Sequence, residues 1–178
     1  MLNHKDKPAM VRWWNGVSAV IDLTTTEGDK WFKDELDRLI KEYGVSGFKL
    51  DAGDSRFYKG IKSKNKVSPN THTELFAKIG LNYPYNEYRA TWKMGGQPLV
   101  QRLHDKGHDW EDIKKLIPQM VLEGIMGYPF SCPDMIGGGQ FTAFLNDAPI
   151  DQELVVRSAQ VHALMPMMQF SVAPWRIL

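Results

Sequence analysis

The sequence lacks most features that would direct it to a specialised class of protein. Cys132 is the only cysteine among the 178 residues, so no disulfide can form within the chain. The formal net charge is +1, which provides no general attraction to nucleic acid or to anionic lipid. No apolar run approaches the ~18 residues of a transmembrane helix, and the first residues lack the apolar segment of a signal peptide. We therefore expect no nucleic-acid or membrane partner, and the compartment stays unknown.

Short apolar segments and a helical pattern alternate at the start of the sequence. Residues 18–23 are apolar and β-branched and predict a buried strand. Thr24 and Glu27 have the spacing of a capping box, and apolar residues then recur at helical spacing as far as Gly44, which ends the helix. Residues 47–51 predict a second strand. A strand–helix–strand unit of this kind is typical of a parallel sheet with a right-handed crossover.

The rest of the chain continues this α/β pattern. Predicted helices cover residues 71–81, 110–126 and 150–165, and further predicted strands cover residues 87–92, 99–103, 128–132 and 167–172. A break is expected near Pro118, which fits the first turn of a second helical piece. About six strands are too few for a closed (β/α)8 TIM barrel and are compatible with part of one. An open doubly wound sheet is the alternative, but no dinucleotide-type glycine fingerprint follows the first strand.

Charged residues follow the predicted strands, where a barrel enzyme holds its catalytic groups. Each would cost several kcal/mol to bury unless it is paired. A single such residue is more commonly a surface or ion-pair residue, so the repeated position is what indicates a site. The residues concerned are Lys49, Asp51, Asp54, Arg89, the run 104–109 and Asp134.

Alternation within residues 48–51 supports this interpretation. In a strand, Lys49 and Asp51 point to one side and Phe48 and Leu50 to the other. In a barrel the charged pair would face inward near the mouth. Lys49 beside Asp51 would favour an ionised carboxylate, as a nucleophile requires. A simple internal ion pair is the alternative.

Two carboxylates that face an oxocarbenium-like transition state carry out glycoside hydrolysis. In a retaining enzyme one carboxylate is an anionic nucleophile, and a second, about 5–5.5 Å away, is protonated on the side of the leaving group. Asp51 is the candidate nucleophile. From position alone its partner is open among Asp105, Asp109 and Asp134.

A set of ordered motifs resembles glycoside hydrolase family 31, in the branch that contains myogenesis-regulating glycosidase and bacterial α-glycosidases. The motifs are WWNGVSAVIDLT at 13–24, KWF at 30–32, GFKLDAGD at 47–54, YRAT at 88–91, QRLHDKGHDW at 101–110, the block 122–138 and the tail 165–176. Two positions depart from the family pattern. Asp54 stands where the family usually has Glu, and Pro133 replaces the histidine of the His-Asp-Ile-Gly-Gly motif.

The resemblance implies roles for individual residues. Asp51 would be the nucleophile and Asp105 the acid/base, with Asp109 as the alternative. Lys49, Arg89 and Asp134 would bind sugar hydroxyls, and Trp14 or Trp92 would form an apolar wall. The resemblance implies an α-glycoside as substrate, with no metal and no organic cofactor. The spacing of His104, His108 and Asp109 matches no recognised metal motif.

The resemblance runs from about Val11 to Trp175, and it implies barrel strands 3 to 8 within a single partial domain at 1–178. The first two strands and the further β-domains of the family would then be absent. A second hypothesis is therefore a non-catalytic barrel fragment that binds sugar weakly or self-associates through open sheet edges. A third is a sugar isomerase or another barrel enzyme, which would typically need a metal or a cofactor.

Overall fold

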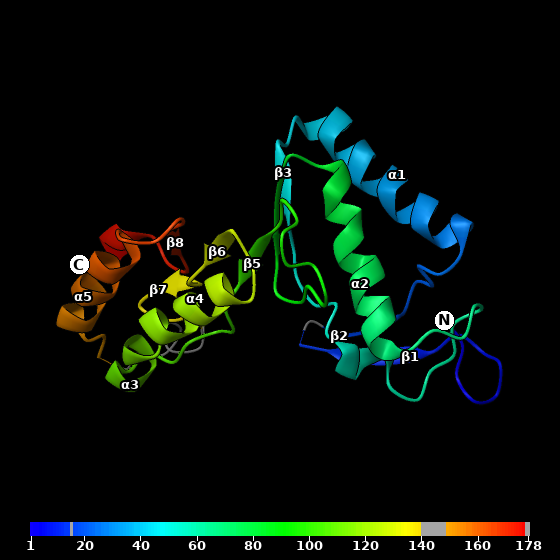
Figure 1. Cartoon of the computed structure of the whole chain (residues 1–178), viewed down its shortest axis with the longest axis horizontal. Helices are drawn as coiled ribbons and strands as arrows, with labels where there is room; N and C mark the ends of the chain where they lie inside the picture. The colour runs from blue at the N-terminus through cyan, green and yellow to red at the C-terminus, as the bar shows by residue number, and fades with distance from the viewer. Residues whose placement is uncertain (15, 140–148, 177–178) are drawn as a thin grey trace. The chain divides into compact units, whose positions relative to one another are not determined.

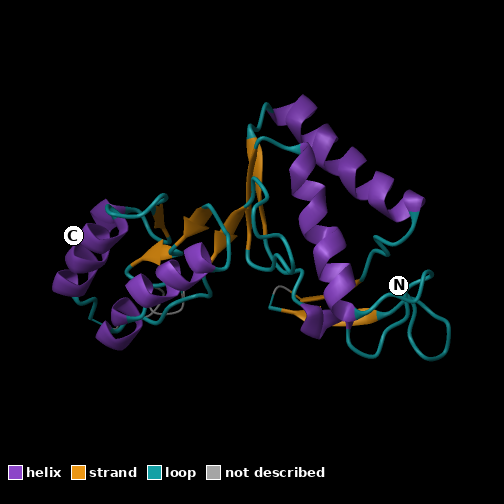
Figure 2. Ribbon diagram, viewed as in Figure 1, coloured by secondary structure: helices purple, strands orange, loops and turns teal. Residues whose placement is uncertain are grey.

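The computed structural model describes residues 1–14, 16–139 and 149–176. The chain divides into two compact units, Met1–Met94 and Gly95–Leu178. Both combine helices with pairs of parallel strands, as the α/β prediction requires (Figures 1 and 2). None of the described helices is both long enough and apolar enough to cross a membrane.

The first unit holds two strand pairs. β1 and β2 form an antiparallel hairpin, whereas β3 and β4 pair in parallel from Gly47↔Tyr85 to Leu50↔Tyr88. Figure 1 shows α1 and α2 on the same side of β3. The elements are β1 (Met10–Trp13), β2 (Gly16–Ala19), α1 (Thr26–Tyr43), β3 (Gly47–Leu50), η1 (Ser55–Tyr58), α2 (Pro69–Ile79), η2 (Gly80–Asn82) and β4 (Tyr85–Tyr88).

The predicted buried strand at 18–23 is wrong in its pairing and in its extent. β2 ends at Ala19, pairs with β1 and is exposed throughout. Beyond it the Val20 N–H donates to the carbonyl of Ala9 at 3.3 Å. The Val20 N–H is therefore bonded to the segment just before β1 and is not available to a neighbouring parallel strand. The apolar pattern correctly predicted that Val20 and Leu23 are buried, since they are 8% and 7% exposed.

In this unit the sequence predicted the ends of the helices to within one or two residues. Thr25 caps α1, because its Oγ1 accepts from the Gly28 N–H at 3.0 Å, so the cap lies one residue after the predicted Thr24. Gly44 ends the helix with a φ of 65°, as predicted, and its N–H donates to the carbonyl of Ile40. α2 begins two residues earlier than expected, since Ser68 is its cap and Pro69 occupies the first turn.

The second unit pairs β5 with β6 in parallel and β7 with β8 in parallel. The predicted helical break is present: α3 ends before Lys115, and Pro118 lies in the first turn of α4. The short strand β7 was not predicted. The elements are β5 (Val100–Arg102), α3 (Trp110–Lys114), α4 (Leu116–Ile125), β6 (Phe130–Cys132), β7 (Met135–Ile136), α5 (Gln152–His162), β8 (Gln169–Phe170) and η4 (Pro174–Arg176).

Candidate active site

Asp51 and Arg89 each follow the last residue of a strand in the first unit. Leu50 ends β3 and is the register partner of Tyr88, which ends β4. The parallel register therefore brings the next residue of each strand to the same edge of the sheet. The Arg89 Nη1 lies 3.6 Å from the Asp51 Oδ1, and the Asp51 side chain remains 36% exposed. The carboxylate is thus held beside a positive charge and is accessible to a ligand.

Arg89 also contacts two further side chains. Its Nη2 donates to the Asp54 Oδ2 at 2.7 Å, so Asp54 reaches the arginine although it is shorter than the glutamate usual in the family. Its guanidinium carbon lies 4.8 Å from the centre of the Trp14 ring, which is a cation–π distance. Trp14 itself is 59% exposed. Arg89 therefore connects Asp51, Asp54 and an open aromatic surface.

Lys49 forms an ion pair with Glu87, a residue that the sequence reasoning missed. The two are register partners in β3 and β4, and the Lys49 Nζ lies 3.3 Å from the Glu87 Oε1. Glu87 is only 5% exposed. The sequence did offer a sign of Glu87, because a carboxylate within a predicted strand is unusual. Its partner could not be predicted, because it depends on the register between β3 and β4. The expected contact between Lys49 and Asp51 stays a prediction.

The backbone just after Asp51 adopts an uncommon conformation. Ala52 has a φ of 69°, in the left-handed region that L-residues rarely occupy. Its N–H donates to the Asp51 Oδ1 at 3.0 Å. Such backbone strain is concentrated at functional sites, where the surrounding structure maintains it. This turn orients the Asp51 side chain from its own backbone.

Arg102 joins Asp105 and Asp134 in the second unit. Its Nη1 donates to the Asp105 Oδ1 at 2.8 Å and to the Asp134 Oδ1 at 3.0 Å. The parallel register of Arg102 with Cys132 places the segments after β5 and β6 at one edge. Arg102 is 3% exposed and Asp134 is fully buried, whereas the Asp105 side chain is 48% exposed. Only Asp105 of this group is thus open to a ligand.

The backbone around Asp134 keeps the pair in place. Asp134 has a φ of 75°, and a Cβ at Gly139 would meet its Oδ2 and approach the Asp105 Cβ. The absence of a side chain at Gly139 therefore lets the backbone pass close to the Asp134 carboxylate and to the Asp105 Cβ. Arg102, like Glu87, was missed by the sequence reasoning. The position of a charged residue within a predicted strand could have identified Arg102 as a site residue.

The neighbouring residues 106–109 have structural partners. The Asp109 Oδ1 accepts from the Asp112 N–H at 2.8 Å and caps α3. Both ring nitrogens of His108 lie within hydrogen-bond distance of backbone groups, at Gly137 and Asp151. Lys106 is 3% exposed, and burial lowers the pKa of its ammonium group while the charge of Asp134 opposes that shift. Within the described ranges no group of three or more potential ligands could hold a metal ion.

The structure thus brings the predicted site residues into two clusters. Trp14, Asp51 and Arg89 lie together in the first unit, with Lys49 on the adjoining strands. Asp105 and Asp134 lie together in the second unit. Asp51 and Asp105 belong to different units, and their action as a catalytic pair stays a prediction.

Comparison with known proteins assigns this architecture to one domain family. Residues 1–174 match the family model described as "Glycosyl hydrolases family 31 TIM-barrel domain". Myogenesis-regulating glycosidase of Mus musculus is 37% identical over 95% of this chain and 25% of its own length. The chain therefore spans about a quarter of this relative.

Solved structures agree in fold. The cycloalternan-degrading enzyme from Trueperella pyogenes matches with a TM-score of 0.80 and 18% identity, over 99% of this chain and 28% of that one. A Flavobacterium johnsoniae family 31 dextranase, solved with glucose, matches with a TM-score of 0.73 and 22% identity over 97% of this chain and 25% of that one. These likenesses show that the fold is a partial TIM barrel of the α/β class.

Proposed function

The chain belongs to glycoside hydrolase family 31, and from that premise we propose that it forms part of the catalytic barrel of a retaining α-glycosidase. The observation that carries the proposal is the position of Asp51 beside Arg89 at the carboxyl ends of β3 and β4. Barrel enzymes bind their substrates at this edge of the sheet. The proposed substrate is a carbohydrate with a terminal α-glycosidic bond, and residues 1–178 are proposed to form one partial domain.

The proposed reaction is a double displacement. The Asp51 carboxylate attacks the anomeric carbon while Asp105 donates a proton to the leaving oxygen, so the glycosidic bond breaks as a glycosyl ester forms. Asp105 then removes a proton from water, and the hydroxide attacks the same carbon and releases Asp51. Two inversions leave the anomeric configuration unchanged. The accessible carboxylates of both residues suit these roles.

The other site residues are assigned to binding and positioning. Arg89 orients Asp51 and offers hydrogen-bond donors to a sugar hydroxyl. The exposed ring of Trp14 provides a surface against which the C–H face of a sugar can stack. Lys49, whose side chain on β3 is 38% exposed, is proposed to bind a sugar hydroxyl. Asp134 is fully buried against Arg102, so we propose that it acts on the sugar through the position of Arg102 and Asp105.

The nucleophile can be identified by covalent trapping. A 5-fluoroglycosyl fluoride forms a glycosyl ester that is hydrolysed slowly, because the fluorine destabilises the oxocarbenium-like transition state. Incubation of the chain with the gluco, galacto and xylo forms, followed by peptide mass spectrometry, should place the label on Asp51. Asp51→Ala should remove the label and abolish turnover of aryl α-glycosides. Label on any other carboxylate would overturn the assignment.

The acid/base residue can be identified from how the effect of its replacement on the cleavage rate depends on the acidity of the leaving group. Asp105→Asn should slow cleavage of an aryl α-glycoside with a weakly acidic phenol by about 10²–10⁴-fold. It should slow cleavage far less when the phenol is strongly acidic, because that oxygen leaves without protonation. Asp109→Asn is the matched control, since Asp109 caps α3 and its loss should leave this dependence unchanged. The opposite pattern would assign the role to Asp109.

The second hypothesis is a non-catalytic fragment that binds sugar weakly. It predicts neither label nor turnover with any of the three sugars. Retained binding of the monosaccharides, measured by calorimetry and abolished by Arg89→Ala, would then support a sugar-binding role.

A further inference from the structure

The turn that follows the proposed nucleophile contains two consecutive left-handed residues. Ala52 has a φ of 69° and Gly53 a φ of 79°. Glycine adopts this conformation readily, but alanine does so at a cost, because its Cβ crowds the backbone. The Ala52 N–H donates to the Asp51 Oδ1 at 3.0 Å, so the direction of the carboxylate depends on this unfavourable conformation. Contacts from elsewhere in the chain must therefore maintain the turn.

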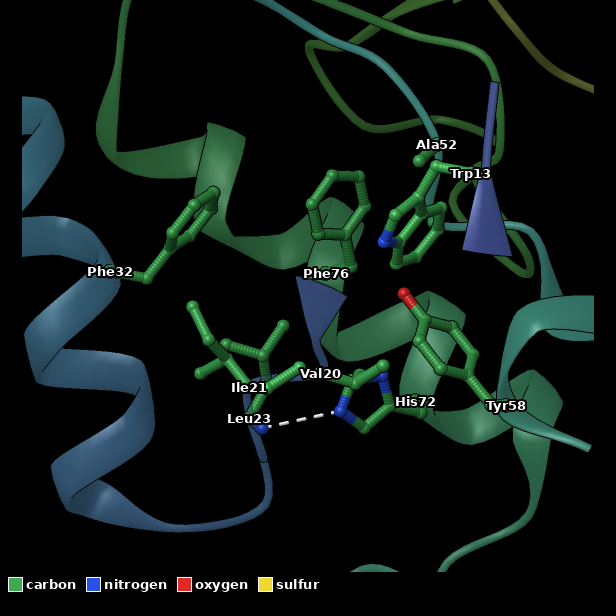
Figure 3. Close-up of a pocket in the computed structure, with 11 residues that line it drawn as sticks. Trp13, Val20, Ile21, Leu23, Phe32, Ala52, Tyr58, His72 and Phe76 are labelled. Atoms are coloured by element: carbon green, nitrogen blue, oxygen red, sulfur yellow. Dashed lines mark hydrogen bonds between the residues drawn. The ribbon is translucent and has the colours of Figure 1, made fainter. Parts of the chain in front are cut away.

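Packing alone does not fix the turn, because a cavity lies beside it. The cavity has a volume of about 150 Å³, and Ala52 and Gly53 form part of its wall (Figure 3). Gly53 also approaches α2 closely, since a Cβ at this position would overlap the ring of Phe76. The turn thus contacts α2 and also borders open space. A void provides no contact atoms that would oppose a movement of the turn.

Thr73 of α2 supplies a directional contact to this turn. Its Oγ1 donates to the carbonyl of Gly53 at 2.7 Å, and Thr73 is only 4% exposed. The same oxygen lies 3.3 Å from the carbonyl of Pro69, one helical turn earlier. A hydroxyl has a single proton, so the shorter contact, to Gly53, takes it. Because Gly53 is itself buried, water is no ready replacement for this hydrogen bond.

The neighbouring residue His72 anchors α2 beside the cavity. Its Nε2 accepts a hydrogen bond from the Leu23 N–H at 3.2 Å, drawn as the dashed line in Figure 3. His72 is 1% exposed and forms part of the cavity wall. Consecutive residues of α2 thus contact two different segments, the one after β2 and the one after β3. The position of Thr73 is therefore determined independently of the turn that it contacts.

We infer that Thr73 is a positioning residue for Asp51, because its hydrogen bond to Gly53 maintains the left-handed turn that directs the carboxylate. The inference rests on the proposed function, in which Asp51 attacks the anomeric carbon. A displacement of a reacting group by about 1 Å can slow a reaction by about 100-fold. Thr73 is buried and acts through the turn, so it affects the rate at which Asp51 reacts and leaves the binding of the sugar unchanged.

The test measures the reaction of Asp51 with the 5-fluoroglycosyl fluorides. Fluoride leaves without protonation, so the rate of labelling reports on Asp51 and not on Asp105. Thr73→Val keeps the shape of the side chain and removes the hydroxyl. We expect the maximal rate of labelling to fall by about 10–100-fold, while the half-saturating concentration of the fluoride stays the same.

Two control variants isolate the contribution of the hydroxyl. Thr73→Ser keeps the hydroxyl and should be labelled at close to the rate of the unmodified chain. Thr71→Val is the matched control on α2, because it removes a hydroxyl whose oxygen lies 2.9 Å from the Ser68 Oγ at the helix cap. It should also be labelled like the unmodified chain. A rate in Thr73→Ser as low as that in Thr73→Val would contradict the role of the hydrogen bond.

Ala52→Gly separates this role from a general contribution of Thr73 to the core. Glycine adopts the left-handed conformation without the cost to alanine, so the turn should depend less on Thr73. In the Ala52→Gly background, Thr73→Val should therefore have an effect on labelling that is about 5-fold smaller. If Thr73→Val alone unfolds the chain, the double variant should recover the fold. Equal effects in both backgrounds, or unfolding of both variants, would overturn the inference.

Hydrogen exchange provides a readout that does not require turnover. In the ¹⁵N-labelled chain the Ala52 amide should exchange about 5-fold faster in Thr73→Val, the effect of one lost hydrogen bond on local opening. The amides of α2 should keep their protection. Absence of label in the unmodified chain would contradict the proposed function alone. Unchanged exchange of the Ala52 amide in Thr73→Val would overturn the positioning role, so the two failures are distinguishable.

Discussion

At the scale of the residue, Glu123 is a carboxylic acid in a position that ordinarily holds an apolar side chain. It lies on α4 and is 6% exposed. Burial raises its pKa to about 7, although a hydrogen bond with Ser131 and the charge of Lys106 oppose the shift. Glu123 is therefore protonated in the folded chain at mildly acidic pH, where it would be ionised in the unfolded chain.

This shift predicts a stability that falls as the pH rises. Between the unfolded pKa of 4.5 and the folded value of about 7, the folded state binds more protons, so its free energy of unfolding decreases with pH by up to ~3 kcal/mol. Above the folded pKa the effect is complete. Glu123→Gln keeps the shape and removes the ionisation. The variant should therefore match the unmodified chain near pH 4.5 and exceed it in stability near pH 7.5.

Urea unfolding followed by fluorescence at both pH values checks this prediction. His162 acts in the opposite sense, because burial lowers its pKa to about 4, but the difference between variant and unmodified chain cancels its effect. Glu111→Gln, on the exposed side of α3, should produce no comparable change. An identical pH dependence with and without Glu123 would contradict the assignment.

At the scale of the element, the ends of the helices are determined by single residues. Gly44 ends α1 at a φ of 65°, and a Cβ there would meet no atom within 4 Å. Any penalty for a side chain at this position is therefore a backbone penalty. Gly124 of α4 also has open space around its Cα but helical backbone angles. The two glycines isolate the effect of conformation from that of packing.

Gly44→Ala should lower the free energy of unfolding by about 1 kcal/mol, because the left-handed conformation is unfavourable for alanine. Gly124→Ala should raise it by up to ~1 kcal/mol, because alanine is the better helix former. Chemical unfolding followed by circular dichroism measures both changes. Effects of the same sign in the two variants would show that packing, and not backbone conformation, dominates at these sites.

α4 also has an unusual distribution of side chains. It buries Leu116 and Glu123, whereas its exposed side carries Ile117, Val121 and Ile125 at helical spacing, 58%, 56% and 77% exposed. Soluble helices normally show the reverse arrangement. Exposed apolar stripes of this kind are typical of interaction surfaces.

At the scale of the whole molecule, this stripe leads to one expectation. At high concentration we expect the chain to self-associate through the exposed apolar stripe on α4. Sedimentation velocity should show a sedimentation coefficient that rises with concentration. Replacing both Val121 and Ile125 with Lys should abolish the rise, because two charges cannot be buried without partners.

Val156→Lys provides the control for that experiment. Val156 lies on α5 and is 39% exposed, so its replacement adds charge to a different helix. The control should associate like the unmodified chain. If all three proteins sediment alike at every concentration, the stripe on α4 does not mediate association.

The sequence by itself determined the features that depend on neighbouring residues. The end of α1 at Gly44, the break before α4 and the strand at Gly47–Leu50 follow from caps, proline geometry and short-range apolar patterns. The ordered motifs also identified the family, because they run along almost the whole chain. These signals are local, so one sequence is enough to interpret them.

Only the tertiary structure decided which residues meet. Residues 18–23 were expected in a parallel sheet, but Ser18 and Ala19 pair with β1, and the Val20 N–H donates to the carbonyl of Ala9. Glu87 became the partner of Lys49, and Arg102 joined Asp105 to Asp134, through strand registers that no local pattern encodes. The cavity beside His72 likewise arises from segments far apart in the sequence. Pairing and enclosure depend on the competition among all segments for the same backbone groups and apolar surface, and folding resolves that competition for the chain as a whole.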